Sequence, residues 1–293
     1  MNIYVFGING QLGKELSRRN SDSCVVAGSD LPDVDVTAPK QVNDVLLSVK
    51  PGLVINAAAY TAVDKAEEEK EIALKVNRDG AENIASVCSD FNIPLFHLST
   101  DYVFGQSKER TTPYTEEDSP SPINYYGETK LAGEKAVLDR HPENSLIIRT
   151  SSVHGAYGHN FVKTMVRLMK ERDELSVVDD QIMSPTWAGW LAEVLLQLAV
   201  KTSVSSQNVT GYLNASNSGA ISWFDFAEEI KKQAFTELGR EAAVLKAIPT
   251  EQYSTPAKRP KYSALDCAKL EKLIPEAQLS WSSGLQKHLT QIL

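Results

Sequence analysis

Three glycines spaced three residues apart, Gly7, Gly10 and Gly13, follow a short apolar run at the start of the chain. The run at residues 2–6 suits a buried strand, and residues 14–19 continue as an amphipathic helix. In such a unit the first glycine permits a tight turn, the second lets a diphosphate approach the backbone, and the third lets the helix pack closely on the strand. The spacing differs from the usual Gly-x-Gly-x-x-Gly, so a strand-turn-helix corner without a ligand is the alternative.

A carboxylate stands at the distance from this turn that a bound dinucleotide requires. A second apolar run, at residues 24–28, ends in Ser29 and Asp30. In dinucleotide-binding folds an acid at this point accepts hydrogen bonds from a ribose hydroxyl. The glycine turn and Asp30 together predict a nicotinamide cofactor, NADPH or NADH.

Strands and helices alternate through the first half of the chain with short connections. Strands are expected at residues 53–56, 95–99 and 145–150, and helices at 39–50, 70–91 and from 125 onward. This alternation predicts a Rossmann-type, doubly wound parallel α/β sheet in residues 1–150. Residues 151–293 mix short strands with helices at 161–171, 185–200 and 222–236, which predicts a smaller C-terminal α/β lobe for the substrate. Residues 185–213 are expected to pack back on the sheet.

The composition excludes several classes of partner. The chain has 293 residues and a net charge of −8, which argues against nucleic acid or an anionic membrane surface. No run approaches the ~20 apolar residues that span a bilayer. Three cysteines without metal-type spacing indicate reduced thiols and a cytoplasmic location.

Of the ten tyrosines, only Tyr126 has a lysine four residues later, Lys130. Residues four apart share one face of a helix, so the ammonium is expected beside the phenol. A phenol titrates near pH ~10 in water, and a neighbouring cation lowers its pKa. The pair is therefore a candidate acid-base device for a carbonyl or alcohol, with Lys130 also able to hold the nicotinamide ribose.

Thr100 follows the strand at 95–99, at the edge where ligands bind in open α/β sheets. Its hydroxyl is expected to hydrogen-bond the same substrate oxygen as Tyr126, which fixes a ketone for hydride delivery. A hydroxyl that only caps local backbone is the alternative.

Long motifs in this chain are similar to those of extended short-chain dehydrogenases/reductases, and closely resemble those of the dTDP-4-dehydrorhamnose reductases. The matching segments are residues 56–67, 99–104, 126–135, 160–161, 184–186 and 255–260. The resemblance implies NAD(P)H-dependent reduction of the 4-keto group of a dTDP-linked 6-deoxyhexulose. It also implies use of both nicotinamides and a homodimer in some members. The destination of the product sugar stays open between lipopolysaccharide, another surface glycan and a secondary metabolite.

The resemblance assigns roles residue by residue. Tyr126 would donate the proton, Lys130 would activate it, and Thr100 would complete the catalytic set. Residues expected to line the cofactor are Gly7, Gly10, Gln11, Leu12, Gly13, Asp30, Asp35, Val36, Ala57, Ala58 and Ala59, with Tyr126 and Lys130. Residues expected at the substrate are Thr100, Asp101, Tyr102, Tyr126, Ser152 and Arg259.

Two departures from the family pattern affect these expectations. Ser152 stands where the family usually has a tryptophan that contacts the sugar nucleotide, which leaves the sugar and the nucleotide open. Some members bind magnesium through glutamates at a dimer contact. Here Glu15 is present, but Gly189 is taken as the matching helix position and Gln291 lacks a carboxylate, so no metal site is predicted.

Several residues have a simpler interpretation. Asp64 and Glu67 are expected at a solvated helix start, and His97 as a strand residue with a satisfied ring. Arg259 is either a clamp for a diphosphate or a surface charge. Alternative functions are a 4,6-dehydratase or 4-epimerase and a non-catalytic regulatory subunit. Tyr102 replaces the glutamate that dehydratases use, which counts against dehydration.

Overall fold

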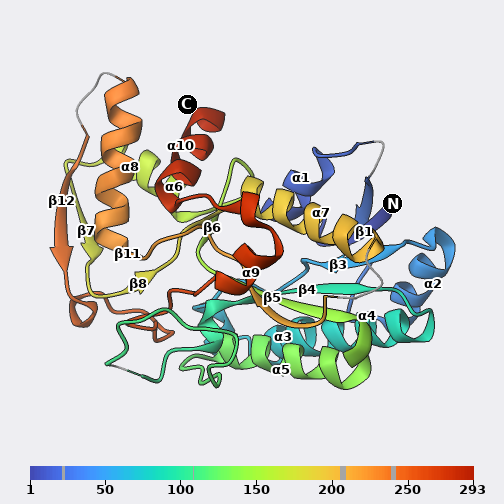
Figure 1. Cartoon of the computed structure of the whole chain (residues 1–293). Helices are drawn as coiled ribbons and strands as arrows, with labels where there is room; N and C mark the ends of the chain where they lie inside the picture. Colours follow the sequence, from blue (N-terminus) through green and yellow to red (C-terminus); the bar gives the residue numbers. More distant parts are fainter. Residues whose placement is uncertain (22–23, 108, 205–208, 239–241) are drawn as a thin grey trace.

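A six-stranded parallel sheet forms the centre of the computed structural model, which describes residues 1–21, 24–107, 109–204, 209–238 and 242–293 (Figure 1). The strand order is β10-β5-β4-β3-β1-β2. The strands are β1 Asn2–Phe6, β2 Val25–Ser29, β3 Leu53–Asn56, β4 Leu95–Thr100, β5 Ser145–Thr150 and β10 Gly211–Asn214. From β1 the chain adds β2 on one side of the sheet and then β3, β4, β5 and β10 on the other side. A ligand crevice is expected where the two sides diverge, at the carboxyl ends of β1 and β3. The predicted Rossmann-type fold is confirmed.

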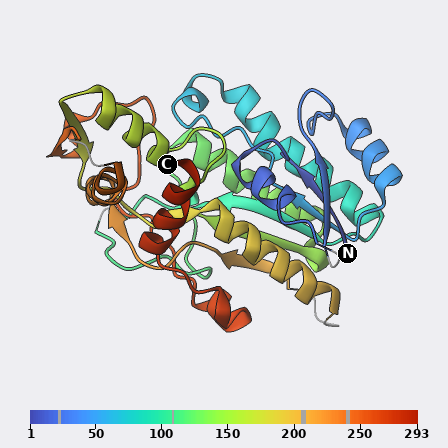
Figure 2. The same ribbon diagram turned by 90° about the horizontal axis from the view of Figure 1, so that it is seen from above.

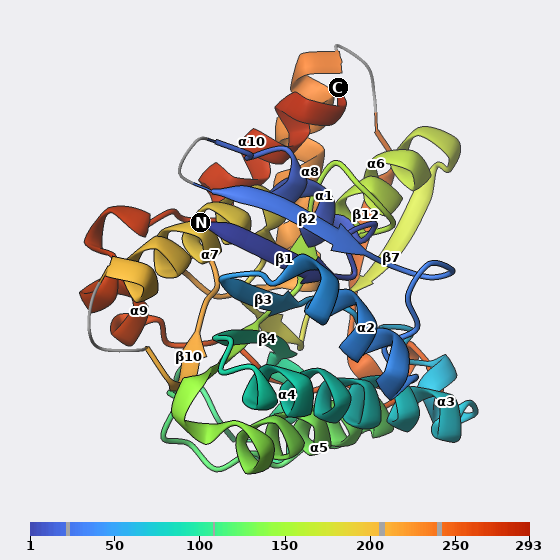
Figure 3. The same ribbon diagram turned by 90° about the vertical axis from the view of Figure 1, so that its right-hand side faces the viewer.

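Helices cover both faces of this sheet (Figure 3). On one face lie α2 (Pro39–Val49), α4 (Gly80–Asp90) and α5 (Tyr125–Arg140), which share a core with the sheet. On the other face α1 (Gln11–Ser17) packs against α7 (Ala188–Val204). The sheet is buried on both sides, which explains its uninterrupted apolar strands.

The helix predicted at residues 70–91 contains a π-helical turn. It consists of α3 (Lys70–Leu74), the π turn Lys75–Asp79 and α4. Within the turn, the buried Asn77 side chain accepts from the backbone N–H of Tyr60 (2.8 Å) and donates to the Thr129 hydroxyl (2.9 Å). The distorted turn thereby fixes the loop after β3 against α5.

A second hydrophobic core lies beside the sheet. The elements that form it lie at the left of Figure 1 and of Figure 2. It is built from α6 (Phe161–Glu171), α8 (Trp223–Leu238) and α10 (Trp281–Ile292), with the parallel pair β7 (Glu174–Val178) and β12 (Val244–Ile248). The other short strands are β6 Val153–His154, β8 Ile182–Met183, β9 Thr186–Trp187 and β11 Ile221–Ser222. One more α-helix is α9 Ala268–Leu273. Short 3-10 turns lie at Lys65–Glu67, Asp101–Val103, Pro142–Asn144, Thr250–Gln252 and Pro275–Ala277.

The helix predicted from residue 185 begins only at Ala188, because Thr186 and Trp187 pair with β6 as β9. Strand β10 is the edge strand of the sheet, and α7 belongs to the helical layer that covers it. Residue 150 as the boundary between the two lobes stays a prediction. Among the described residues, none of the helices combines the length and apolar character that crossing a bilayer would need. Cys24, Cys88 and Cys267 are free thiols.

Candidate active site

The glycine turn after β1 approaches the neighbouring backbone closely. Gly7 has φ +85°, and a Cβ there would lie 2.7 Å from the backbone nitrogen of Ala58. A Cβ at Gly13 would lie 2.4 Å from the carbonyl oxygen of Gly7. Only glycine fits these two positions, so the turn keeps the bare backbone surface that a diphosphate can approach.

Asp30 lies beside this turn, at the carboxyl end of β2. Its carboxylate accepts hydrogen bonds from the backbone N–H groups of Asn9 (3.2 Å) and Leu31 (2.9 Å). The ammonium of Lys14 donates to the side-chain oxygen of Asn9 (2.9 Å), so Asn9 contacts both this cation and the Asp30 carboxylate. The fit of glycine backbone and acid suits the diphosphate and ribose of a nicotinamide dinucleotide.

Other residues expected at the cofactor differ in their hydrogen bonds and in their burial. Ala57 to Ala59 follow β3, where the Asn56 side chain accepts from the N–H of Ala58 (3.1 Å). Asp35 accepts from the N–H of Thr37 (2.8 Å), and the Val36 carbonyl accepts from Asn83 (3.0 Å). The Leu12 side chain is buried in the core below α1, so a contact of Leu12 with the cofactor is left to its backbone and stays a prediction.

The start of α5, which carries Tyr126, is fixed by contacts from distant parts of the chain. Asn124 caps the helix by accepting from the N–H of Gly127 (2.8 Å), and it donates to the carbonyl of Lys258 (2.8 Å). The N–H of Tyr125 donates to the Glu67 carboxylate (2.9 Å). Glu67 therefore accepts a hydrogen bond at the N-terminus of α5, whereas it was expected as a solvated charge.

The expected acidification of Tyr126 by Lys130 is wrong for this structure. Burial raises the pKa of Tyr126 to about 12, the Asp101 charge raises it further, and only a hydrogen bond with Thr100 opposes the rise. The Lys130 ammonium instead donates to the carbonyl of Leu98 (2.7 Å). Tyr126 is thus protonated at neutral pH, which is the form that can give a proton to a ketone.

Lys130 is buried, with 2% of its surface exposed. Burial lowers its pKa to about 8, and the negative charge of Glu134 opposes that shift. Glu134 lies one turn further along α5, where it accepts from Ser99 (2.5 Å) and pairs with Arg149 on β5. Sequence analysis missed Glu134, although its spacing of four from Lys130 was a usable signal.

Asp101 is enclosed by the protein instead of facing the sugar as expected. Its carboxylate accepts from the hydroxyls of Thr100, Ser151 and Ser263, and its side chain is 2% exposed. The structure therefore does not place Asp101 as a free sugar ligand. Thr100 is brought to Tyr126, and its oxygen also accepts from the N–H of Tyr102 (3.1 Å).

Tyr102, Ser152 and Arg259 have different surroundings. The Tyr102 ring packs edge-on against that of Tyr126, with centroids 6.0 Å apart. Ser152 adopts φ +45°, a left-handed backbone conformation that is uncommon for a residue other than glycine. Arg259 binds both carboxylate oxygens of Asp64 (3.1 and 2.8 Å), so Asp64, whose side chain is 41% exposed, is an ion-pair partner as well as a partly solvated charge.

The glutamate considered for magnesium binds a guanidinium. Arg19 pairs with Glu15 (2.5 Å) and, from its other nitrogen, with Glu193 (3.1 Å). On α7, the residue that Arg19 bridges to Glu15 is Glu193. Gly189 as the position that matches the family's glutamate stays a prediction. Over the described ranges, no three His, Cys, Asp or Glu side chains gather as a metal site would require.

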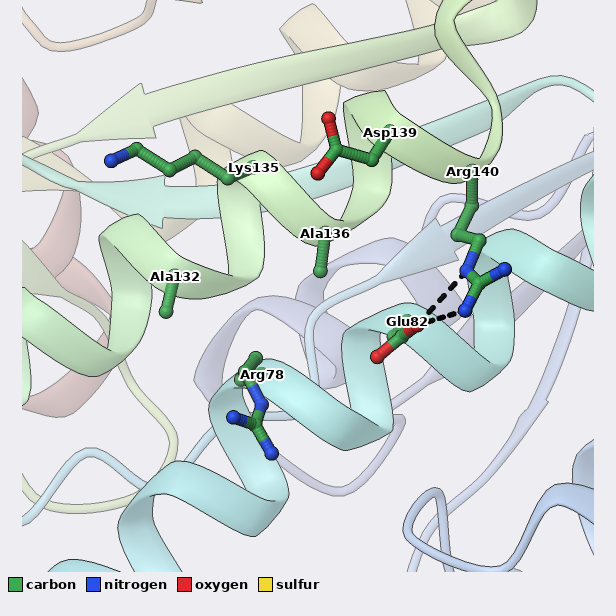
Figure 4. Close-up of a pocket in the computed structure, with 7 residues that line it drawn as sticks. All are labelled: Arg78, Glu82, Ala132, Lys135, Ala136, Asp139 and Arg140. Atoms are coloured by element: carbon green, nitrogen blue, oxygen red, sulfur yellow. Dashed lines mark hydrogen bonds and ion pairs between the residues drawn. The ribbon is translucent and has the colours of Figure 1, made fainter.

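His97 and a surface hollow lie outside the catalytic group. The Nδ1 of His97 contacts the Asn56 amide (3.1 Å), whereas its Nε2 is buried without a partner, so its ring is only half satisfied. A hollow of about 390 Å³ lies between α4 and α5 (Figure 4). Its charged lining includes the Arg140–Glu82 pair, and Lys130 is not among the residues that line it.

The whole chain matches one protein family. Residues 1–293 match the model described as RmlD substrate binding domain. The dTDP-4-dehydrorhamnose reductase of Escherichia coli (strain K12) is 38% identical over 298 residues, covering 100% of this chain and 98% of that protein. The chain belongs to this family. The resemblance predicted from the sequence motifs is confirmed.

Solved structures of family members agree with the fold. A dTDP-4-dehydrorhamnose reductase from Bacillus anthracis in complex with NADP has a TM-score of 0.89 and 37% identity, covering 99% of both chains. A UDP-glucose 4-epimerase from Thermus thermophilus in complex with NAD has a TM-score of 0.83 at 17% identity. At that identity the epimerase supports the shared fold alone.

Proposed function

We propose that this protein reduces the 4-keto group of a dTDP-linked 6-deoxyhexulose with NADPH or NADH, converting dTDP-4-dehydro-L-rhamnose to dTDP-L-rhamnose. The observation that carries the proposal is the gathering of Thr100, Tyr126 and Lys130 at the carboxyl end of β4, in the same sheet edge as the glycine turn. The relatives named dTDP-4-dehydrorhamnose reductase support the substrate class.

The side chains divide the reaction between them. A nicotinamide cofactor held by the glycine turn and Asp30 would, in its reduced form, supply the hydride that adds to the sugar C4 carbon. Tyr126, a phenol that is protonated at neutral pH, gives its proton to the ketone oxygen, which becomes the new hydroxyl. To stabilise the phenolate that remains, the Lys130 ammonium would have to turn to it from the Leu98 carbonyl, to which it donates in this structure. The Thr100 hydroxyl lies beside the Tyr126 oxygen.

The direct test is oxidation of NADPH or NADH on addition of dTDP-4-dehydro-L-rhamnose, with the product sugar identified by NMR. Cofactor oxidation in step with formation of dTDP-L-rhamnose supports the proposal. No turnover with this ketone, while the protein is folded and binds the cofactor, rejects it.

A second substrate deserves the same assay because of Ser152. Where the family usually has a tryptophan, this chain has a small polar residue with left-handed backbone. A relative from Streptomyces niveus named dTDP-4-keto-6-deoxy-D-glucose reductase is 37% identical, covering 89% of this chain and 87% of that protein. Comparing kcat/KM for the two keto sugars, and for their UDP analogues, decides which sugar and nucleotide the site prefers.

The remaining expectations belong to the same proposal. We propose a cytoplasmic enzyme, supported by three free thiols, that acts as a monomer or homodimer. A non-catalytic regulatory role is the alternative. Cofactor binding without turnover on any of the keto sugars would favour that alternative over a reductase.

A further inference from the structure

The loop that follows β3, residues 57–59, is held at both ends by the side chain of an asparagine. The Asn56 side chain accepts from the N–H of Ala58 (3.1 Å), and the Asn77 side chain accepts from the N–H of Tyr60 (2.8 Å). A backbone N–H can only donate. In each asparagine, therefore, the amide oxygen faces the loop N–H, and the NH₂ group needs an acceptor of its own.

Each of the two NH₂ groups has such an acceptor. That of Asn77 donates to the Thr129 hydroxyl (2.9 Å) and to the Tyr60 carbonyl (3.1 Å). That of Asn56 lies 3.1 Å from Nδ1 of His97, its direct neighbour across the β3–β4 pair. Because an NH₂ group can only donate here, Nδ1 carries a lone pair and the ring proton is on Nε2.

This orientation explains the unpaired nitrogen of His97. Its Nε2 is buried and has no hydrogen-bond partner in the part of the chain that the structure describes. A buried N–H without an acceptor is costly, so the ring gains nothing from Nε2. What the ring supplies is an acceptor at Nδ1, directed at Asn56.

The surroundings of His97 keep the ring in this neutral form. The residue is 1% exposed. Burial, and then the positive charge of Lys130, hold the pKa of His97 well below its usual value. A protonated ring would direct an N–H at the Asn56 NH₂ group and would turn the amide oxygen away from Ala58. The neutral ring is thus the form that keeps the loop in place.

The loop supports the glycine turn of the cofactor site. A Cβ on Gly7 would lie 2.7 Å from the backbone nitrogen of Ala58 and 2.8 Å from the carbonyl carbon of Ala57. The backbone of the turn therefore rests directly on the backbone of the loop. A shift of Ala58 would move the surface that the diphosphate of a dinucleotide approaches.

We propose that His97 is a positioning residue for the nicotinamide dinucleotide: its Nδ1 orients the Asn56 amide, and this amide holds Ala58 under the glycine turn. The role rests on the expected place of the cofactor, at Gly7 and residues 57–59. It does not depend on which sugar is reduced.

Leucine and asparagine have nearly the same shape, so His97→Leu and His97→Asn form a matched pair. The asparagine amide oxygen can take the place of Nδ1 as an acceptor, whereas leucine offers none. In a calorimetric titration with NADPH, the Kd should rise about fivefold or more in His97→Leu and stay within about twofold of wild type in His97→Asn. His141→Leu is the control, because it removes another buried imidazole, one that contacts the Ile93 carbonyl (2.9 Å), and should leave the Kd unchanged.

Urea unfolding of the same variants separates positioning from stability. If the ring only fills the core, the two His97 variants bind NADPH equally well, or their Kd values follow their free energies of unfolding. Either result overturns the proposal. We expect instead a weaker cofactor complex in His97→Leu at a stability close to that of His97→Asn. His97→Phe also lacks the acceptor and tests the same loss where His97→Leu does not fold.

The ring tautomer is measured in the wild-type protein by nitrogen NMR of labelled histidines. A protonated Nε2 and a bare Nδ1 are expected for His97, and a proton on Nδ1 overturns the proposal whatever the variants do. Neither measurement needs the sugar substrate. Absence of turnover in the wild type would reject the proposed function, whereas equal NADPH affinity in the matched pair would reject only the role of His97.

Discussion

Glu134 and Arg149 form a bidentate ion pair in which both side chains are almost completely buried. The Nε of Arg149 donates to Oε1 of Glu134 (2.9 Å), and its Nη2 donates to Oε2 (2.7 Å). The exposed fraction of the side chain is 1% for Arg149 and 0% for Glu134. The guanidinium also lies over the Tyr212 ring, 4.4 Å from its centroid. This pair joins α5, which carries Tyr126 and Lys130, to β5.

Glu134→Gln should destabilise the protein by about 3–5 kcal/mol, because it leaves the Arg149 charge buried without a counter-ion. Urea unfolding of the two proteins measures the difference. Arg167→Ala is the matched control, since its pair with Glu171 is exposed and should contribute at most about 1 kcal/mol. Equal losses in the two variants would show that burial of the pair has no special effect.

Tyr126→Phe should lower kcat by a factor on the order of 10²–10⁴, the usual contribution of a positioned proton donor. Cofactor affinity should stay unchanged, because the ring and its packing on Tyr102 are retained. Steady-state kinetics and a cofactor titration give both numbers. Near-normal turnover would remove Tyr126 from the proposed role.

Lys130→Met should impair turnover and weaken cofactor binding together. The ammonium is expected to hold the nicotinamide ribose and to stabilise the phenolate, in addition to its bond with Leu98. Lys130→Arg keeps the charge, but the larger planar guanidinium does not fit a compact buried site. This variant should therefore restore little of the turnover. An unchanged dissociation constant for NADPH in Lys130→Met would limit the residue to fixing β4.

The choice of nicotinamide should be weak, with kcat/KM for NADH and NADPH within roughly a hundredfold, about 2.7 kcal/mol. Asp30 disfavours a 2′-phosphate, whereas the nearby ammonium of Lys14, bound to Asn9, can turn to it. Lys14→Ala should therefore lower kcat/KM for NADPH by about fivefold, the effect of about 1 kcal/mol, and leave NADH unaffected. Lys135→Ala, on the outer side of α5, is the control. Equal effects of Lys14→Ala on both cofactors would exclude a phosphate contact.

Local patterns in the sequence were sufficient for the fold, and they singled out Thr100, Tyr126 and Lys130, whose catalytic roles stay predictions. The glycine turn and Asp30 depend on spacing within one strand-turn-helix-strand unit, and Tyr126 and Lys130 depend on spacing within one helix. Contacts between distant segments left no such signal. The hydrogen bond from Ser263 to Asp101 spans 162 residues, so no pattern indicated that this carboxylate would be enclosed.

The acidity of Tyr126 was also beyond sequence reasoning. Spacing placed a cation on the same helix face, but the pKa depends on how far the phenol is removed from water and on where the cation donates. The structure directs Lys130 to Leu98, and burial dominates. Similarly, nothing near Asp64 in the sequence indicated that Arg259 would pair with it across 195 residues.

The decisive measurement for the role of Tyr126 is a crystal structure of the protein with NADP⁺ and dTDP-L-rhamnose. We expect the Tyr126 hydroxyl within about 3 Å of the sugar O4 atom, with the nicotinamide C4 carbon facing the sugar C4 carbon. A Tyr126 hydroxyl turned toward solvent or the core, with the sugar bound elsewhere, would contradict it.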